Sequence, residues 1–208
     1  MGQAHRSVTG GKKSRRREEM KRLGFVFIAV LTAFIFTGCP GTGSDPVTYA
    51  LGDTGPAGGL IFYIDEADEF SWDYLEAAPS DQSTWQVWIE GGLTQSTLNG
   101  NTSTAIGTGQ ANSDYIIAQE GHTGSAAKVC LDYDDGIYSD WFLPSKDELN
   151  QMYVNLKFEG VGGFADYYYW SSSEYDALYV WNQYFINGSQ FRVFGKNGGY
   201  YVRAVRAF

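Results

Sequence analysis

The chain has very few of the residues that build metal centres and covalent catalytic sites. Its 208 residues include two cysteines, Cys39 and Cys130, and two histidines, His5 and His122. A structural zinc site needs four closely spaced Cys or His ligands, and a disulfide framework needs several cysteine pairs. No zinc spacing and no Ser-His-Asp set is present. The sequence therefore predicts no cofactor, no metal and no catalysed reaction.

A hydrophobic run long enough to cross a membrane is also missing. The apolar run covers residues 23–36, whereas a spanning helix needs about 20 residues. It follows a basic segment and ends at Thr37, Gly38 and Cys39, a pattern typical of an export signal. A cysteine directly after small residues resembles the bacterial lipoprotein signal, in which that cysteine is lipidated. We therefore assign residues 1–38 to a signal peptide and Cys39 to lipid attachment.

Two details of this leader stay open. Met20 begins a more typical signal by itself, so residues 1–19 are interpreted as lying upstream of the true start. The alternative to lipidation is an ordinary signal peptide that is cut elsewhere. If Cys39 carries lipid, Cys130 has no cysteine to pair with inside the chain, and we expect it to be a small buried residue.

Basic residues are scarce after the signal. Positions 39–208 keep 7 of the 15 Lys and Arg residues and 22 of the 24 Asp and Glu residues, a net charge of −15. Such a surface repels nucleic acid and anionic glycans at long range. We expect no nucleic-acid partner, and the charge favours a cationic one.

The rest of the chain is long enough for one domain with its own core. Residues 39–48 form the lipidated cysteine and a flexible Pro- and Gly-rich tether, and residues 49–208 form a loop-rich α+β domain. Strands are predicted at 59–64 and 72–78, and helices through 115–119 and over 125–131. Between them, residues 79–104 are expected to be a long polar loop pinned by Trp85 and Trp88.

The best-defined helix begins after Ser145. Ser145 and Glu148 have the spacing of a capping box, in which each side chain bonds the other residue's backbone N–H. Leu149, Met152, Tyr153 and Leu156 then recur with helical spacing, which predicts one apolar face directed at the core.

Near the C-terminus, Asn187 and Gly188 predict a two-residue hairpin turn. The predicted partners are Ile186 with Ser189, Phe185 with Gln190, Tyr184 with Phe191, Gln183 with Arg192, Asn182 with Val193 and Trp181 with Phe194. Both faces of this hairpin then carry aromatic and aliphatic residues, although a surface hairpin normally has one polar face. The second face must be covered by other elements or must bind a ligand.

Two motifs favour ordinary structure over chemistry. The acidic segment 132–140 has oxygen ligands for calcium but lacks the spacing of an EF-hand loop, so a solvated turn is the better interpretation. Gly107 and Gly109 suggest a phosphate loop but lack a third glycine and a βαβ context.

Several segments, in their order along the chain, resemble one family, the bacterial surface lipoproteins with an Lcl-type C-terminal domain. They are GPAGGLIF (55–62), YLEAAP (74–79), GTGQAN (107–112), SDWFLPSKDEL (139–149), YWSSSEY (169–175) and VRAVRAF (202–208). The resemblance implies a C-type lectin-like fold of the formylglycine-generating-enzyme branch. In this fold the first and last strands pair, two helices pack on the sheet, and a long loop carries function.

Some proteins with a similar tail are variable target proteins of diversity-generating retroelements, in which Asn codons are mutated while other positions stay fixed. Because the third base of such a codon stays a pyrimidine, the mutated codon cannot encode Trp, Gln or Lys. Trp181, Gln183, Gln190 and Lys196 are therefore expected to be fixed. The resemblance implies that the interleaved residues contact ligand: Ala177, Leu178, Tyr179, Val180, Tyr184, Ile186, Ser189, Phe191, Arg192, Val193, Phe194, Gly195, Asn197, Gly198, Gly199, Tyr200 and Tyr201.

The resemblance and the residues together predict an exported lipoprotein, anchored by lipid to the bacterial cell envelope and exposed at the surface. Its partner is expected to be a protein or another cell-surface ligand. One alternative is a structural or adhesin lipoprotein whose hairpin is covered. Another is an enzyme of the formylglycine-generating type, which the sequence disfavours because such enzymes use two active-site cysteines. The calcium-binding tripeptides of sugar-binding lectins are absent as well.

Overall fold

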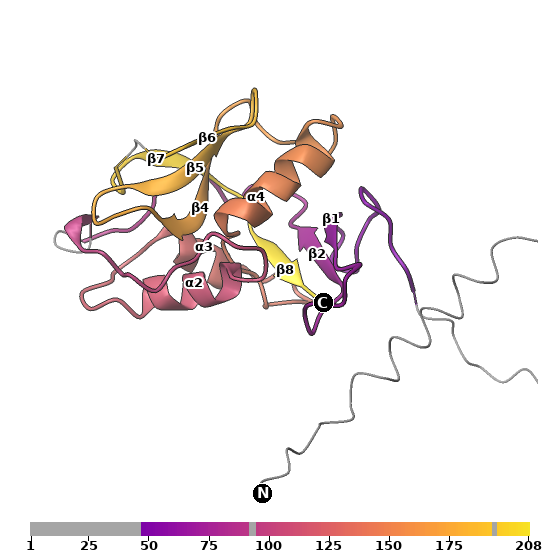
Figure 1. The fold of residues 1–208 in the computed structure, drawn as a ribbon, viewed down its shortest axis with the longest axis horizontal. Coiled ribbons are helices and arrows are strands. Elements are labelled where there is room, and N and C mark those ends of the chain that lie inside the picture. The colour runs from indigo at the N-terminus through magenta and orange to yellow at the C-terminus, as the bar shows by residue number, and fades with distance from the viewer. Residues whose placement is uncertain (1–46, 92–94, 193–194) are drawn as a thin grey trace, which may run out of the picture. The chain divides into compact units, whose positions relative to one another are not determined.

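The computed structural model describes residues 47–91, 95–192 and 195–208 (Figure 1). The predicted signal peptide, Cys39 and most of the predicted tether lie outside the described residues. The described elements, in chain order, are β1 (Leu60–Ile64), β2 (Tyr74–Ala77), β3 (Ser83–Val87), α2 (Gly109–Ile117), α3 (Ala126–Leu131), α4 (Lys146–Met152), the π-helical continuation η2 (Tyr153–Lys157), β4 (Tyr168–Glu174), β5 (Val180–Tyr184), β6 (Ser189–Phe191), β7 (Gly199–Val202) and β8 (Val205–Ala207).

The strands form two sheets, which makes the domain a mixed α+β structure as predicted. The small sheet has the order β1-β2-β8, and the large sheet has the order β3-β7-β4-β5-β6. The pair β4–β7 is parallel, and the other named pairs are antiparallel. Because only Arg203 and Ala204 separate β7 from β8, the C-terminal segment leaves the large sheet and enters the small one directly.

Two apolar cores lie on different sides of the large sheet. The first contains Trp88, Trp141 and Trp170 and is closed by α2 and α3, which lie below the large sheet in Figure 1. The second contains Tyr169 and Phe185 together with residues of α4, which contacts β1, β4 and β5. The large sheet is therefore held by helices from two directions.

Local sequence signals locate α3 and α4 correctly, whereas α2 begins and ends earlier than the predicted helix through 115–119. Ser145 and Glu148 form the predicted capping box at the start of α4. The apolar face of this helix is confirmed, since Leu149, Met152 and Leu156 are fully buried and Tyr153 is half-buried. Ser125 caps α3 through a hydrogen bond from the Lys128 N–H. Cys130 is buried in the first core, as expected for a small apolar side chain.

The predicted hairpin register is wrong by two residues. Asn182 pairs with Phe191 and Tyr184 pairs with Ser189, so the loop contains four residues, 185–188. Gly188 alone in this loop has a positive φ, and its N–H donates to the Tyr184 carbonyl at 2.8 Å. Phe185 leaves the strand because its ring is buried in the second core, 4.3 Å from the centroid of the Tyr169 ring.

A shift of two residues does not change which side chains share a face, because side chains alternate with a period of two. Tyr184, Asn182 and Phe191 still share one face of the hairpin, and Trp181, Gln183 and Gln190 share the other. The face assignment from sequence therefore holds although its register does not.

Two other expectations are corrected. The first and last strands do not pair directly, because β2 lies between β1 and β8. The segment 79–104 is not all loop, since it contains β3, which forms an antiparallel pair with β7. Trp88 is fully buried and pins this segment, whereas Trp85 is 69% exposed and lies against Gly199.

Candidate binding surface

The most prominent exposed feature of the large sheet is a group of aromatic rings, which we call the tyrosine surface. It consists of Tyr167, which directly precedes β4, Tyr168 of β4, Tyr184 of β5, Phe191 of β6 and Tyr200 of β7. Tyr168 lies at its centre and stacks on Tyr184, with ring centroids 4.4 Å apart. The centroids of Tyr200, Tyr167 and Phe191 lie 5.3, 5.6 and 6.1 Å from that of Tyr168.

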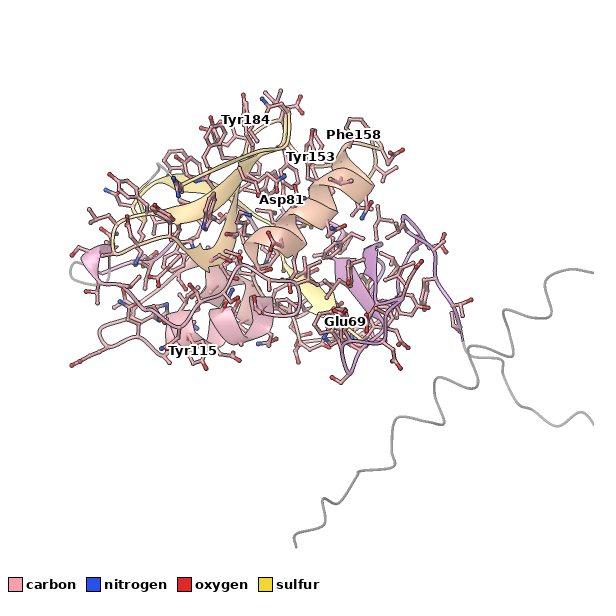
Figure 2. All side chains as sticks on the ribbon, viewed as in Figure 1. Glu69, Asp81, Tyr115, Tyr153, Phe158 and Tyr184 are labelled. Atoms are coloured by element: carbon pink, nitrogen blue, oxygen red, sulfur yellow. The ribbon has the colours of Figure 1, made fainter. Side chains whose placement is uncertain are left out.

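The rings of the tyrosine surface are accessible to a ligand. Tyr167 is 39% exposed, and the other four side chains are half-buried. Ile186 extends the surface at the hairpin tip and is 53% exposed. In Figure 2, Tyr184 lies at the upper edge of the molecule, away from Tyr115 on α2.

The tyrosine surface is amphipathic rather than charged. Burial, together with the neighbouring Tyr167 and Tyr168 hydroxyls, raises the pKa of Tyr200 to about 12. At neutral pH its phenol therefore keeps its proton and remains a hydrogen-bond donor. The surface offers apolar ring faces and neutral hydroxyl groups, a combination that suits contact with a protein.

The structure divides the seventeen predicted ligand-binding residues by exposure. The exposed ones are Leu178, Tyr179, Ile186, Ser189, Arg192 and Asn197, and the half-buried ones are Ala177, Tyr184, Phe191, Gly195, Gly198, Tyr200 and Tyr201. Val193 and Phe194 lie outside the described residues. Val180 and Gly199 are buried, so neither is placed where a ligand would touch it. Val180 packs in the first core, and Trp85 covers Gly199.

The residues expected to be fixed hold the opposite face of the hairpin. Gln183 is fully buried, and its amide donates to Asn150 Oδ1 at 2.9 Å and to the Gly188 carbonyl at 3.0 Å. Gln190 donates to the Lys146 carbonyl at 2.9 Å. These bonds tie the hairpin to α4 and leave the tyrosine surface outside.

Lys196 forms a buried ion pair beneath the turn that follows β6. Its Nζ lies 2.5 Å from Glu174 Oε1, and the two side chains are 0% and 2% exposed. Lys196 also donates to the Thr97 carbonyl at 2.8 Å, while Glu174 accepts from the N–H groups of Asn99 and Gly100. The pair therefore joins the end of β4, the segment 97–100 and the turn at 195–198.

Sequence reasoning missed Tyr167 and Tyr168, which contribute two of the five rings. The run of aromatic residues at 167–170 was visible, but nothing local indicates which of them faces outward. Tyr169 and Trp170 are fully buried, whereas Tyr167 is exposed. Pairing of β4 with β5 and β7 decides that outcome.

The groups that bear most on an enzymatic alternative have structural roles. His122 Nε2 lies 2.9 Å from Ser125 Oγ, but that hydroxyl caps α3 and Ser125 is 1% exposed. Burial raises the pKa of the Cys130 thiol well above its usual value, so no thiolate forms at neutral pH. The prediction that the chain catalyses no reaction stays a prediction.

The acidic segment 132–140 contains turn and ion-pair contacts. Asp134 and Asp135 accept backbone N–H groups of the turn that follows α3, and Asp140 pairs with Arg206 at 2.9 Å. Over the described ranges, no three His, Cys, Asp or Glu side chains gather as they would around a metal ion. These contacts are those of a turn, and the preference for a turn over a calcium site stays a prediction.

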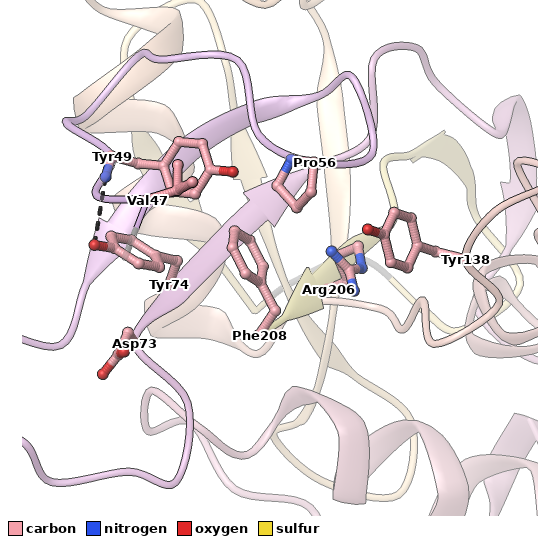
Figure 3. A pocket seen from close by; sticks show the side chains of 8 residues that line it. All are labelled: Val47, Tyr49, Pro56, Asp73, Tyr74, Tyr138, Arg206 and Phe208. Atoms are coloured by element: carbon pink, nitrogen blue, oxygen red, sulfur yellow. Dashed lines mark hydrogen bonds between the residues drawn. The ribbon is translucent and has the colours of Figure 1, made fainter. Parts of the chain in front are cut away.

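A pocket of about 380 Å³ lies beside the small sheet (Figure 3). Tyr49, Tyr74 and Phe208 form one aromatic wall, and Tyr138 covers the Arg206 guanidinium at 3.9 Å. Arg206 is already paired with Asp140 and Glu76. The pocket therefore presents aromatic walls and a cation whose charge is already balanced.

No protein-family model matches the chain, and no curated protein matches it. Among the described residues, no helix combines the length and the hydropathy needed to cross a membrane.

Proposed function

We propose that this chain is an exported lipoprotein that displays a C-type lectin-like binding domain at the bacterial cell surface. In this proposal Cys39 carries the lipid, residues 40–48 form the tether, and the tyrosine surface binds a protein ligand. The resemblance to Lcl-type lipoproteins supports the anchor and the finer fold class. The exposure of the tyrosine surface supports the binding role.

That exposure is the single observation on which the proposal depends. A purely architectural domain with a covered hairpin requires Tyr184, Ile186 and Phe191 to be buried under other elements. None of the three is buried: Ile186 is 53% exposed, and Tyr184 and Phe191 are half-buried. Exposed aromatic patches of this kind mark interaction sites more often than inert surface.

The binding surface is tested by selecting ligands without assuming their identity. A phage-displayed library of random peptides is panned on the chain carrying Cys39→Ser, which removes the predicted lipid site. We expect the selected peptides to bind the Tyr184→Ser variant at least about tenfold more weakly, as at an aromatic hot spot. Tyr115→Ser is the matched control, because Tyr115 is an exposed tyrosine on α2, outside the tyrosine surface.

The proposal is wrong if both tyrosine variants bind the selected peptides as well as the parent chain does. The anchor is tested separately: Cys39→Ala should abolish palmitate incorporation and release the chain from the membrane fraction. A leader cut elsewhere predicts no change in either measurement.

The proposal includes diversification of the C-terminal segment. It is supported by the division between Gln183, Gln190 and Lys196, which hold the fold, and exposed positions such as Ile186 and Asn197. Sequencing the end of the gene across many cells of one lineage tests it. Substitutions confined to the seventeen positions, beside a nearby template copy, are expected; an invariant segment without such a copy would exclude diversification.

A further inference from the structure

One cation of the described domain is not paired with an acid. Seven Lys and Arg residues lie within the described ranges, against 21 Asp and Glu residues. Six of the seven form ion pairs: Lys128, Lys146, Lys157, Lys196, Arg203 and Arg206. Arg192, at the end of β6, is exposed and has no carboxylate partner in the described part of the chain.

Aromatic rings hold the Arg192 guanidinium in place. Its carbon atom lies 4.3 Å from the centroid of the Tyr175 ring and 5.8 Å from that of Trp181. These two rings contact each other edge to face. Stacking occupies a flat face of the guanidinium and leaves its N–H groups pointing outward at the edge. The side chain is therefore oriented before any ligand arrives, which reduces the entropy lost on binding.

The surroundings of Arg192 are apolar and accessible. Tyr175, Leu178 and Tyr179 are 45%, 50% and 36% exposed. A second cation, Lys146, lies 5.0 Å from the Trp181 ring, although it is paired with Asp147. The domain as a whole has three times as many acidic as basic residues within the described ranges, so a polyanion such as a sulfated glycan is repelled. A single carboxylate flanked by apolar side chains is not excluded in this way.

Arg192 also lies where one ligand can reach both faces of the hairpin. β6 is one of the two edge strands of the large sheet. Phe191 belongs to the tyrosine surface, and Arg192, next in the chain, contacts Trp181 on the opposite face. A protein loop that passes around this edge contacts the aromatic rings on one side and the guanidinium on the other.

From these observations we infer that Arg192 is a recognition site for a carboxylate, supplied by an Asp or Glu side chain in a loop of the protein partner. The planar guanidinium matches a carboxylate through two parallel hydrogen bonds. This inference rests on the proposed function and adds the chemistry of the ligand to it.

The test uses the same random-peptide library and the chain carrying Cys39→Ser. Peptides selected on this chain are expected to be enriched in Asp and Glu. Arg192→Gln should weaken their binding by about tenfold or more, and Arg192→Lys should give a smaller loss because it keeps the charge without the planar fork. Lys128→Gln, which removes an exposed cation on α3, should leave binding unchanged.

A double-mutant cycle identifies the contact itself. Replacing the peptide's acidic residue by its amide should cost as much as Arg192→Gln, and combining the two changes should cost no more than either alone. The loss should shrink at high salt, since the pair is solvent-exposed. Thermal unfolding of Arg192→Gln at the parent temperature would show that the fold is intact.

Each contrary result has a distinct meaning. If Tyr184→Ser weakens binding but Arg192→Gln does not, the carboxylate inference is wrong and the proposed function stands. Selected peptides without acidic residues lead to the same conclusion. If neither variant changes binding, the tyrosine surface is not the binding site and the proposed function is wrong as well.

Discussion

The buried pair Lys196–Glu174 should dominate the stability of the region that carries the tyrosine surface. Both side chains are shielded from water, and each has further hydrogen bonds to backbone groups. Lys196→Met keeps the aliphatic stem but leaves the Glu174 carboxylate buried without its cation. Removing one partner of such a pair costs about 3–5 kcal/mol. In a domain of this size, that loss lowers Tm by roughly 6–20 °C.

The structure indicates where in that range the value should fall. The N–H groups of Asn99 and Gly100 continue to bond the Glu174 carboxylate after Lys196 is removed. We therefore expect a loss near the lower end, about 3 kcal/mol. Glu174→Gln should cost a similar amount, because it leaves a buried ammonium group with neutral oxygen acceptors, such as the Thr97 carbonyl, and no negative charge beside it.

A double-mutant cycle read by urea and thermal unfolding measures the pair. The combined variant should lose less stability than the two single variants together, with a coupling energy of about 2 kcal/mol. Lys128→Met is the control, since Lys128 and Asp132 form an exposed i, i+4 pair, and it should cost less than about 0.5 kcal/mol. If Lys196→Met costs no more than Lys128→Met, the buried pair does not hold this region and our reasoning is refuted.

Two further predictions concern other buried polar groups. Burial raises the pKa of Glu148 to about 7. The proton bound to Glu148 therefore stabilises the fold fully below the unfolded pKa of about 4.3, and this contribution, about 4 kcal/mol of the free energy of unfolding, is lost as pH rises through 7. Glu148→Gln should flatten this pH dependence in urea unfolding. The Asn182 side-chain amide is buried without hydrogen-bond partners. Asn182→Leu removes this unpaired polar group, so it should raise the free energy of unfolding by about 1–2 kcal/mol and Tm by a few degrees. A lower Tm would contradict this.

The parts of the fold that were predictable are those encoded by neighbours in sequence. The capping box at Ser145 and Glu148, followed by the apolar stripe of α4, defines a helix without reference to the rest of the molecule. The hairpin register was not predictable in this way. Asn187 and Gly188 favour a two-residue turn locally, but burial of Phe185 among Tyr153, Phe164 and Tyr169 overrides that preference.

Strand β3 shows the same limit. Its sequence, STWQV, is polar and lies in a segment rich in Ser, Thr and Gly, so composition indicates a loop. Its pairing with β7, more than a hundred positions later in the chain, makes it a strand. Trp85 and Trp88 differ in burial for a similar reason, since the pairing fixes which side of the sheet each one meets.

The candidate site was predictable as a segment but not as a surface. Sequence reasoning placed it at 177–201, and the exposed residues of the hairpin lie there. Tyr167 and Tyr168 precede that segment and join it only because β4 lies between β5 and β7. Val180 and Gly199 belong to the segment and are buried by tertiary contacts. Neither the extra residues nor the buried ones follow from local pattern.

The arrangement separates what holds the hairpin from what the hairpin presents. Gln183, Gln190 and Lys196 form hydrogen bonds to α4 and to the segment 97–100. Losing such a bond leaves a buried polar group without its partner, at a cost of about 1–3 kcal/mol each. Ile186 and Asn197 point outward, and exposed substitutions typically change stability by less than about 0.5 kcal/mol. Replacing the outward residues therefore changes the exposed surface of the hairpin while leaving the fold nearly as stable. This is the physical requirement that a diversified binding protein has to meet.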